Sequence, residues 1–474
     1  MMQQILLSYG VGGSKDYWSL ELRPNTHDAG TSVTGNGPRV DSSGNVYSAF
    51  AFDDSSGNNE VLAGLIKTDS EGVLQWVRGY TPRTDRTDMG IENHGFDVSS
   101  SGVILHAISQ GYKRLEYELL ATDGTTTSYI KRIGEGPASG DRVFNPFGVR
   151  IGASGGHYLT GRDFDNIQSG AKFSVYKLTS GGAISWARYI KGSSSAQDMY
   201  TGRQFGIDSS ENTYHSMYYY LLPMAGNGYR NASTIAKYNS SGTLQWKQEY
   251  KIGSSSTAWD LIQIKGVTCD SSGNSYAFGR YVQASFFSGA RGIIIKSNSS
   301  GSTQWVKQVP QDSDGYGGEL EYGGAVDSSG NLYVNTTGRH NSDRVAVVVH
   351  KFNSSGVAQW SRKLYYNAAA LGLVWGFCSV DSNDNLYITA YVPVSSVNRV
   401  VIFKVLTDGT GTGDYGNLTW ASTTTTSISD ISSGSGYELN VSNLGAGSLN
   451  QVNGTISIDQ TNISSPSLNT LSYL

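Results

Sequence analysis

Apolar and polar residues alternate along most of this chain in short segments that end in turns rich in Asp, Ser, Gly and Asn. Alternation with a period of two is the pattern of a β-strand with one buried face, and turns of this composition join consecutive strands. The clearest stretch runs Val326-Asp327-Ser328-Ser329-Gly330-Asn331-Leu332-Tyr333. The pattern predicts an all-β protein with almost no helix.

The same arrangement recurs seven times, at intervals of 53 to 62 residues. The first turn of each repeat begins at Asp41, Ser99, Gly152, Asp208, Asp270, Asp327 and Asp381. An apolar residue precedes each of these positions, and a Tyr or, once, a Leu follows six residues later. The second turn follows Lys67, Leu119, Lys177, Lys237, Lys296, Lys351 and Lys404. In the first six repeats it leads to a strand that carries Trp76, Tyr129, Trp186, Trp246, Trp305 or Trp360.

Repeats of this length, built from short strands and tight turns, are typical of a β-propeller, in which each repeat forms one blade. Two turns per repeat imply four strands per blade, so the sequence predicts a seven-bladed β-propeller over residues 17–420. Trp18 lies 23 residues before Asp41, within the 21 to 24 residues that separate the other aromatic strands from the next first turn. We therefore expect the strand around Trp18 to complete the seventh blade, which leaves the segment after about Thr410, with Trp420, for another role.

The aligned motifs, Val-Asp-Ser-Ser-Gly-Asn-x-Tyr followed by Lys-x-x-x-x-Gly-x-x-x-Trp, resemble the seven-bladed β-propeller (SBBP-type) repeat family, which is related to the NHL-type propellers. The resemblance covers about residues 18–420. It implies an extracellular or surface-exposed scaffold whose repeats carry no catalytic residues. Residues 1–10 and 415–422 also resemble the ends of virion proteins from tailed marine bacteriophages.

Composition separates a C-terminal segment from the propeller. Residues 421–474 contain no Lys or Arg and are rich in Ser, Thr, Asn and Gly. Alternation nevertheless persists at 437–441 and 455–459, so we predict a β-rich extension rather than a disordered tail. Two roles stay open for it: docking or oligomerisation, or a strand-like arm packed on its own propeller. Residues 1–16 are expected to form an N-terminal docking segment.

Charge and targeting signals restrict the partners and the location. The formal net charge is −4 and no run of Lys and Arg occurs, which argues against nucleic acid as a partner. The first ten residues lack the features of a signal peptide, and no apolar run reaches the roughly 18 residues of a membrane-spanning helix, so no membrane insertion is expected. A surface-type propeller without an export signal is expected in a virion, which assembles in the host cytoplasm and becomes an extracellular particle.

These observations predict a non-enzymatic structural or host-attachment protein of a tailed-phage virion, such as a tail, fibre or baseplate component. The expected partners are other virion proteins and copies of the same chain, bound through the terminal segments. A cell-surface glycan is a further candidate partner. The alternative function is that of a bacterial surface lectin or adhesin built on the same scaffold.

Candidate ligand-binding residues come from the side of the propeller opposite the tight turns, where the loops are individual. Three repeats end their second strand with Gly-Arg, which gives Arg162, Arg280 and Arg339. These guanidinium groups could bind carboxylates of a ligand, or pair with acidic residues of the neighbouring blade. Exposed rings could stack on sugar faces or cover gaps between blades, and the candidates are Tyr219, Tyr220, Tyr229, Trp259 and Trp375. Residues 218–233 and 281–291 are expected to be long loops.

Enzymatic chemistry, metals and cofactors are not expected. The seven His residues show no metal-ligand spacing, although His157 and His215 hold equivalent positions in adjacent repeats. The turn at Asp381 has part of a calcium-loop pattern but lacks the downstream Glu, so we interpret it as a variant turn. Cys269 and Cys378 are expected to be buried free thiols, because they lie on nonadjacent blades. Where a repeat has both the Asp and the Lys, the two are expected to pair with each other as a structural contact; the second repeat lacks both, and the third keeps Lys177 against Gly152.

Overall fold

The regular elements of the computed structural model are β-strands, and no helix occurs among the residues that it describes. The described residues are 5–14, 16–24, 37–53, 61–80, 91–110, 117–124, 127–133, 143–164, 172–191, 199–224, 228–252, 261–282, 290–309, 320, 323–341, 344–367, 374–392, 399–415, 418–423, 429–430, 439–443, 450–453 and 468–470. In this part of the chain no helix could span a membrane.

The strands form seven antiparallel sheets, numbered in chain order. Sheet 1 contains β3 (Arg39–Val40), β4 (Val46–Asp53), β5 (Val61–Thr68) and β6 (Leu74–Tyr80), with β36 (Leu468–Thr470) outside β6. Sheet 2 contains β7 (Ile91–Val98), β8 (Ile104–Gln110), β9 (Tyr117–Thr122) and β10 (Thr127–Ile133). Sheet 3 contains β11 (Val143–Ile151), β12 (His157–Phe164), β13 (Lys172–Leu178) and β14 (Ile184–Lys191), with β35 (Asn450–Asn453) outside β14.

Sheet 4 begins with β15 (Met199–Thr201) and β16 (Gly206–Ile207), which both pair with β17 (Thr213–Met224). It continues with β18 (Gly228–Tyr238), β19 (Leu244–Ile252) and β34 (Leu439–Asn443). Sheet 5 contains β20 (Leu261–Cys269), β21 (Ser275–Val282), β22 (Arg291–Ser297) and β23 (Thr303–Val309), with β33 (Ser429–Asp430) outside β23.

Sheet 6 contains β24 (Gly324–Val326), β25 (Leu332–Asn341), β26 (Arg344–Phe352) and β27 (Ala358–Tyr366), then β32 (Leu418–Ser422) and β31 (Gly413–Tyr415). Sheet 7 contains β28 (Val374–Val380), β29 (Asn385–Val392) and β30 (Arg399–Leu406), then β2 (Tyr17–Pro24) and β1 (Ile5–Ser14).

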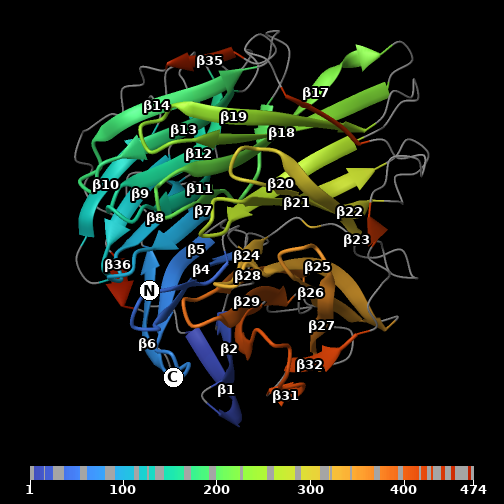
Figure 1. The fold of residues 1–474 in the computed structure, drawn as a ribbon. Coiled ribbons are helices and arrows are strands. Elements are labelled where there is room, and N and C mark those ends of the chain that lie inside the picture. The colour runs from blue at the N-terminus through green and yellow to red at the C-terminus, as the bar shows by residue number, and fades with distance from the viewer. Residues whose placement is uncertain are drawn as a thin grey trace.

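The sheets pack around a central axis as four-stranded blades, which confirms the predicted all-β propeller (Figure 1). Apolar side chains of consecutive sheets form a core between them; for example, Tyr47 and Leu65 of sheet 1 pack with Phe96 and Ile104 of sheet 2. The tyrosine of the repeat is buried wherever it occurs, because it points into this core.

A carboxylate organises the first turn of most repeats. In sheet 1, Asp41 Oδ1 accepts hydrogen bonds from the backbone N–H groups of Ser43 and Asn45, both at 2.9 Å. Its Oδ2 accepts from Asn45 Nδ2 at 2.8 Å and from the Tyr47 hydroxyl at 2.9 Å. Asp208, Asp270, Asp327 and Asp381 make the same set of bonds in their repeats. One residue type therefore satisfies the turn and fixes the buried tyrosine at the same time.

Neighbouring blades share a second recurring contact, in which a Trp Nε1 and a Lys Nζ donate to one backbone carbonyl of the next blade. Trp246 and Lys237 of sheet 4, for example, both donate to the Ser299 carbonyl of sheet 5, at 3.0 and 3.4 Å. The equivalent contact joins sheets 3 and 4, 5 and 6, and 6 and 7. Hydrogen bonds of this kind hold each of the sheets from 3 to 6 to the one after it.

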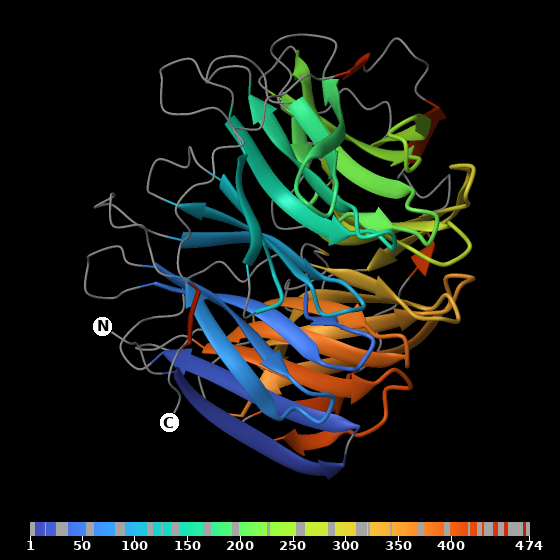
Figure 2. The same ribbon diagram turned by 90° about the vertical axis from the view of Figure 1, so that its left-hand side faces the viewer.

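The N-terminal strand closes the ring, as the spacing of Trp18 predicts. β2 pairs with β30 of sheet 7, with Trp18 opposite Lys404. In Figure 2 the dark-blue N-terminal strands lie beside the orange strands of the late part of the chain. Trp18 Nε1 and Lys404 Nζ donate to the Ser70 carbonyl of sheet 1, at 3.1 and 3.2 Å. The last sheet is therefore joined to the first by the same contact that joins sheets 3 to 7 to one another.

The C-terminal segment runs back along the outside of the propeller. β32 adds to sheet 6, with Trp420 opposite Leu364. β33, β34, β35 and β36 then pair with the outer strands of sheets 5, 4, 3 and 1, so that β35 and β36 lie at the rim in Figure 1. These described parts of the extension lie on its own propeller, as the second of the two predicted roles expects. Its docking role stays a prediction.

Candidate functional site: the axial cavity

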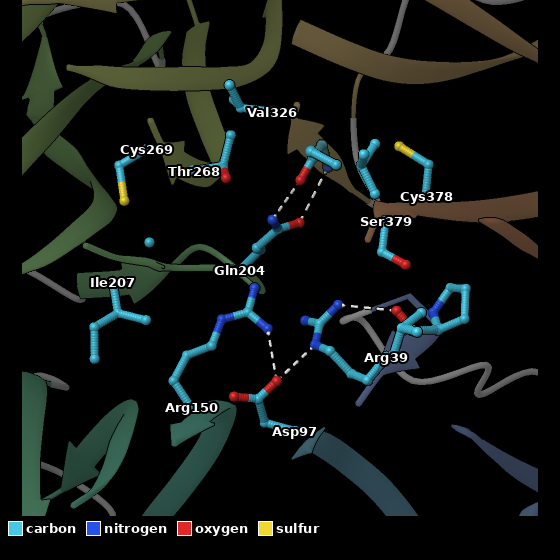
Figure 3. Close-up of a pocket in the computed structure, with 16 residues that line it drawn as sticks. Arg39, Asp97, Arg150, Gln204, Ile207, Thr268, Cys269, Val326, Cys378 and Ser379 are labelled. Carbon is cyan, nitrogen blue, oxygen red and sulfur yellow. Dashed lines mark hydrogen bonds and ion pairs between the residues drawn. The ribbon is translucent and has the colours of Figure 1, made fainter. Parts of the chain in front are cut away.

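A cavity of about 270 Å³ lies on the propeller axis and is lined by the first strands of the blades (Figure 3). The residue two positions before each first turn contributes to its wall in every repeat, and these residues are Arg39, Asp97, Arg150, Gly206, Thr268, Ala325 and Ser379. A shared position in the repeat therefore becomes a ring of side chains around one space. None of these seven residues is among the binding residues predicted from the sequence.

Three charged side chains lie on the cavity wall: Arg39, Asp97 and Arg150. Asp97 Oδ1 accepts from Arg39 Nε at 2.7 Å and from Arg150 Nη1 at 3.3 Å. Its Oδ2 accepts from the Ile151 backbone N–H at 2.8 Å. The arginine side chains are each 12% exposed, and that of Asp97 is 9% exposed. The two cations thus share one largely buried carboxylate on the cavity wall.

Burial dominates the electrostatics of this group. It raises the pKa of Asp97 and lowers the pKa of Arg39, and their mutual attraction opposes both shifts. Because a buried charge loses its hydration, the group depends on the protein for its solvation. Asp97 is therefore held as an ion-pair partner of the two arginines.

Gln204 extends from sheet 4 to sheet 6 across one side of the cavity. Its Nε2 donates to the Gly324 carbonyl at 2.6 Å, and its Oε1 accepts from the Gly324 N–H at 3.1 Å. Cys269 and Cys378 also line the cavity and are both free, as expected, although only Cys378 is fully buried. Burial raises the pKa of both thiols, which keeps them protonated at neutral pH.

The two equivalent histidines lie inside the blades. His215 is packed among Phe173, Phe205 and Tyr238, with ring centroids 4.9 to 5.9 Å away. Burial lowers its pKa to about 3, and it lowers the pKa of His157 to about 4. Among the described residues, no group of three potential metal ligands comes together. A neutral His215 in an aromatic shell is a core residue.

Arg162 takes part in a stack that crosses three blades. Its guanidinium carbon lies 4.1 Å from the ring centroid of Tyr200, which stacks on Tyr218 at 5.0 Å. Lys265 Nζ of sheet 5 lies 5.0 Å from the Tyr218 centroid, and Arg162 Nε donates to the Met199 carbonyl. Cations and rings thus cover each other's faces, as the gap-covering interpretation of the aromatic residues expects.

The other candidate residues do not join this stack in the described part of the structure. Arg280 Nε donates to Gln263 Oε1 at 2.9 Å within its own sheet. Tyr219 is buried and its hydroxyl donates to Glu249. Four further candidates belong to described strands, but their side chains lie outside the described residues: Arg339 on β25, Tyr220 on β17, Tyr229 on β18 and Trp375 on β28. Trp259 lies entirely outside the described residues.

Two local expectations need correction. The stretch 218–233, expected to be a loop, belongs to the β17–β18 hairpin except for residues 225–227, which are not described. The repeat's Lys is linked to its Asp through the tyrosine rather than directly: Lys296 Nζ lies 5.0 Å above the Tyr276 ring, whose hydroxyl donates to Asp270.

At Asp381 the carboxylate accepts four protein hydrogen bonds, as in a variant turn.

Comparison with protein-family models finds no match for this chain, and comparison with curated proteins finds none either. The resemblance to the SBBP-type family therefore stays a prediction. Solved structures that match include a subtype N11 neuraminidase-like protein of A/flat-faced bat/Peru/033/2010, with a TM-score of 0.41 and 10% identity over 88% of this chain and 96% of that chain.

Two further structures are similar at the same level. A protein of unknown function from Dyadobacter fermentans has a TM-score of 0.40 and 10% identity, over 85% of this chain and 97% of that chain. The GH93 α-L-arabinofuranosidase of Fusarium graminearum has a TM-score of 0.40 and 11% identity, over 69% and 96%. Likeness at this level carries no inference about the function of this chain.

Proposed function

We propose that this chain is a non-enzymatic structural or host-attachment protein of a tailed-phage virion, with a closed ring of seven blades as its binding scaffold. The observation that carries the proposal is which strands form the outer rim of the propeller. In every sheet except sheet 2, the outermost described strand comes from one of the chain ends: β1, β31, β33, β34, β35 or β36. A partner that approaches the rim meets these segments first.

The rim strands offer a means of assembly. Each terminal strand uses one edge to pair with the propeller, and among the described residues no strand pairs with its other edge, which could take an incoming strand. Other virion proteins and further copies of this chain are the partners that we propose for this rim. A sheet edge binds through backbone groups, which suits the polar, Ser- and Thr-rich composition of the C-terminal segment.

The axial cavity supports a role without catalysis. Among the described residues, Asp97 is the one carboxylate on its wall; it accepts from two arginines and one backbone N–H, so both of its oxygens have fixed donors. The stacked rings of Tyr200 and Tyr218 also have their faces covered by each other, by Arg162 and by Lys265. These two rings give no support to the lectin alternative, because sugar stacking needs an open ring face.

The experiment asks whether the protein is part of virus particles released by the cells that make it. Particles are purified by density gradient and labelled with gold-conjugated antibodies raised against the chain. The expected result is labelling at one fixed place on the particle, whereas a chain that ends at Ser422 is expected to be missing from the particles. Recovery of the full chain only in the cell-envelope or free soluble fraction would contradict the proposal.

A further inference from the structure

We propose that the axial cavity binds one small carboxylate anion between the guanidinium groups of Arg39 and Arg150. The proposal concerns the axis of the propeller and is independent of the docking role proposed for its rim.

The first argument is charge balance. Two arginines and one aspartate are the charged residues on the cavity wall, which leaves one positive charge without a partner. Both arginine side chains are about nine-tenths buried, at 12% exposure. Burying a charge is costly unless an opposite charge accompanies it. A single monovalent anion would complete the group.

The second argument is the direction of the unused donors. Arg39 donates from Nε to Asp97 and from Nη1 to the Pro38 carbonyl, and its Nη2 is buried without a partner. Arg150 donates from Nε to the Phe205 carbonyl and from Nη1 to Asp97. Figure 3 shows the two guanidinium groups next to each other above Asp97.

Another residue of the cavity wall, Ser379, also has a polar group. The Ser379 hydroxyl is buried without a hydrogen-bond partner and lines the same cavity. A hydroxyl can donate to a second oxygen of a ligand that the arginines hold.

The groups on the cavity wall and the volume of the cavity indicate the class of ligand. A guanidinium matches the two oxygens of a carboxylate better than it matches a spherical ion. The rest of the wall includes Val40, Ile207, Ala325 and Val380, which could contact a short apolar group. A volume of about 270 Å³ exceeds that of one water, roughly 30 Å³, several-fold. The fit is to a short-chain carboxylate such as acetate or propionate.

The test measures the thermal midpoint of the full chain as sodium acetate replaces sodium chloride at constant ionic strength. Acetamide, which has the same shape but no charge, serves as the control ligand. A bound ligand raises the midpoint in a saturable way, so acetate is expected to do so and acetamide is not. Isothermal titration calorimetry with acetate should give one site per chain.

Variants connect the effect to the cavity. Arg150→Gln is expected to weaken acetate binding at least tenfold, and Ser379→Ala several-fold. Arg188→Gln is the matched control. Arg188 lies on β14, an outer strand of its blade and therefore far from the axis, and it donates to the Gly242 carbonyl. It should leave acetate binding unchanged.

Three results would overturn the proposal. Acetate and acetamide could shift the midpoint equally, or Arg150→Gln could bind acetate as well as Arg188→Gln does. Chloride alone could bind with equal affinity and compete with acetate, which would assign the site to a spherical anion instead. If Arg150→Gln does not fold, Ser379→Ala decides the assignment, because it leaves the ion pairs in place.

Discussion

The third repeat has Gly152 where five repeats have the turn Asp, and a carboxylate from the next blade occupies the space. Glu211 Oε1 accepts from the Ser154 N–H at 2.6 Å. Its Oε2 accepts from the Tyr158 hydroxyl at 2.8 Å and from Lys177 Nζ at 2.9 Å. A Cβ on Gly152 would lie 2.5 Å from Glu211 Oε1. Glu211 therefore replaces the missing aspartate from outside the repeat.

This substitution predicts a specific pattern of stabilities. Glu211→Gln is expected to destabilise the protein by about 1–3 kcal/mol, because it leaves buried donors without their charged acceptor. Gly152→Asp alone is also expected to destabilise, since two carboxylates would share one space. The double variant Gly152→Asp/Glu211→Gly should recover most of the loss, because it restores the turn of the other repeats and removes a positive φ of 58° from a non-glycine residue. Urea unfolding measures the free energy of unfolding of all three variants. A loss in the double variant as large as the two single-variant losses together would contradict this account.

The same carboxylate gives a pH dependence. Burial alone would raise the pKa of Glu211, but the bonds from Ser154, Lys177 and Tyr158 outweigh it and lower the pKa to about 2. A depressed carboxyl pKa stabilises the fold above its unfolded value, near pH 4.5, and this contribution disappears as the pH falls toward 2. The loss of stability between pH 5 and 3 should therefore be smaller in Glu211→Gln than in the wild type. Equal losses would show that Glu211 does not carry this effect.

At this scale the sequence showed the turns but not the cavity. The turn starts and the buried tyrosine are local features that repeat, so one aligned sequence reveals them. Arg39, Asp97 and Arg150 share one position in three consecutive repeats, and this charged series at a strand position facing the axis was the available signal. The role of Glu211 could not be predicted, because it depends on the distance between two blades.

The strand β2 illustrates the scale of single elements. Trp18 is buried, packs with Tyr387 at a centroid distance of 6.3 Å, and lies against Gly72 of sheet 1. Its Nε1 bond to the Ser70 carbonyl joins the last sheet to the first. One side chain thus contributes both core packing and ring closure.

Trp18→Ala is expected to cost about 3–5 kcal/mol, as for other large core truncations. Trp18→Phe keeps a buried ring and loses mainly the hydrogen bond, so it should cost less, with about 1 kcal/mol from the bond itself. Denaturant unfolding of both variants gives the comparison. A loss below about 1 kcal/mol for Trp18→Ala would show that β2 does not hold the ring closed.

The spacing of aromatic residues placed β2 correctly, because it follows the repeat. The same reasoning failed for residues 218–233, where the strands continue beyond the usual blade length. There the run Tyr218-Tyr219 packs on both faces of the strand: Tyr218 stacks on Tyr200, and Tyr219 reaches Glu249. Packing with neighbouring strands, which one segment cannot reveal, extends the hairpin.

At the scale of the whole molecule, the C-terminal segment joins sheets that lie far apart in the sequence. It adds strands to sheets 6, 5, 4, 3 and 1 in that order. Alternation in the sequence predicted strands there, but it could not name the edge to which each strand would pair. Backbone hydrogen bonds carry little sequence information, so a polar strand can pair with its own propeller or with another chain.

Hydrogen exchange of the full chain, compared with a chain that ends at Ser422, tests this central claim most directly. Loss of β33 to β36 uncovers β23, β19, β14 and β6, whereas β27 stays covered by β32 and serves as the internal control. We predict that amide exchange in the four uncovered strands becomes faster in the shortened chain while β27 keeps its protection. Equal exchange in both chains, with the fold intact, would mean that the C-terminal segment does not form the rim of its own propeller.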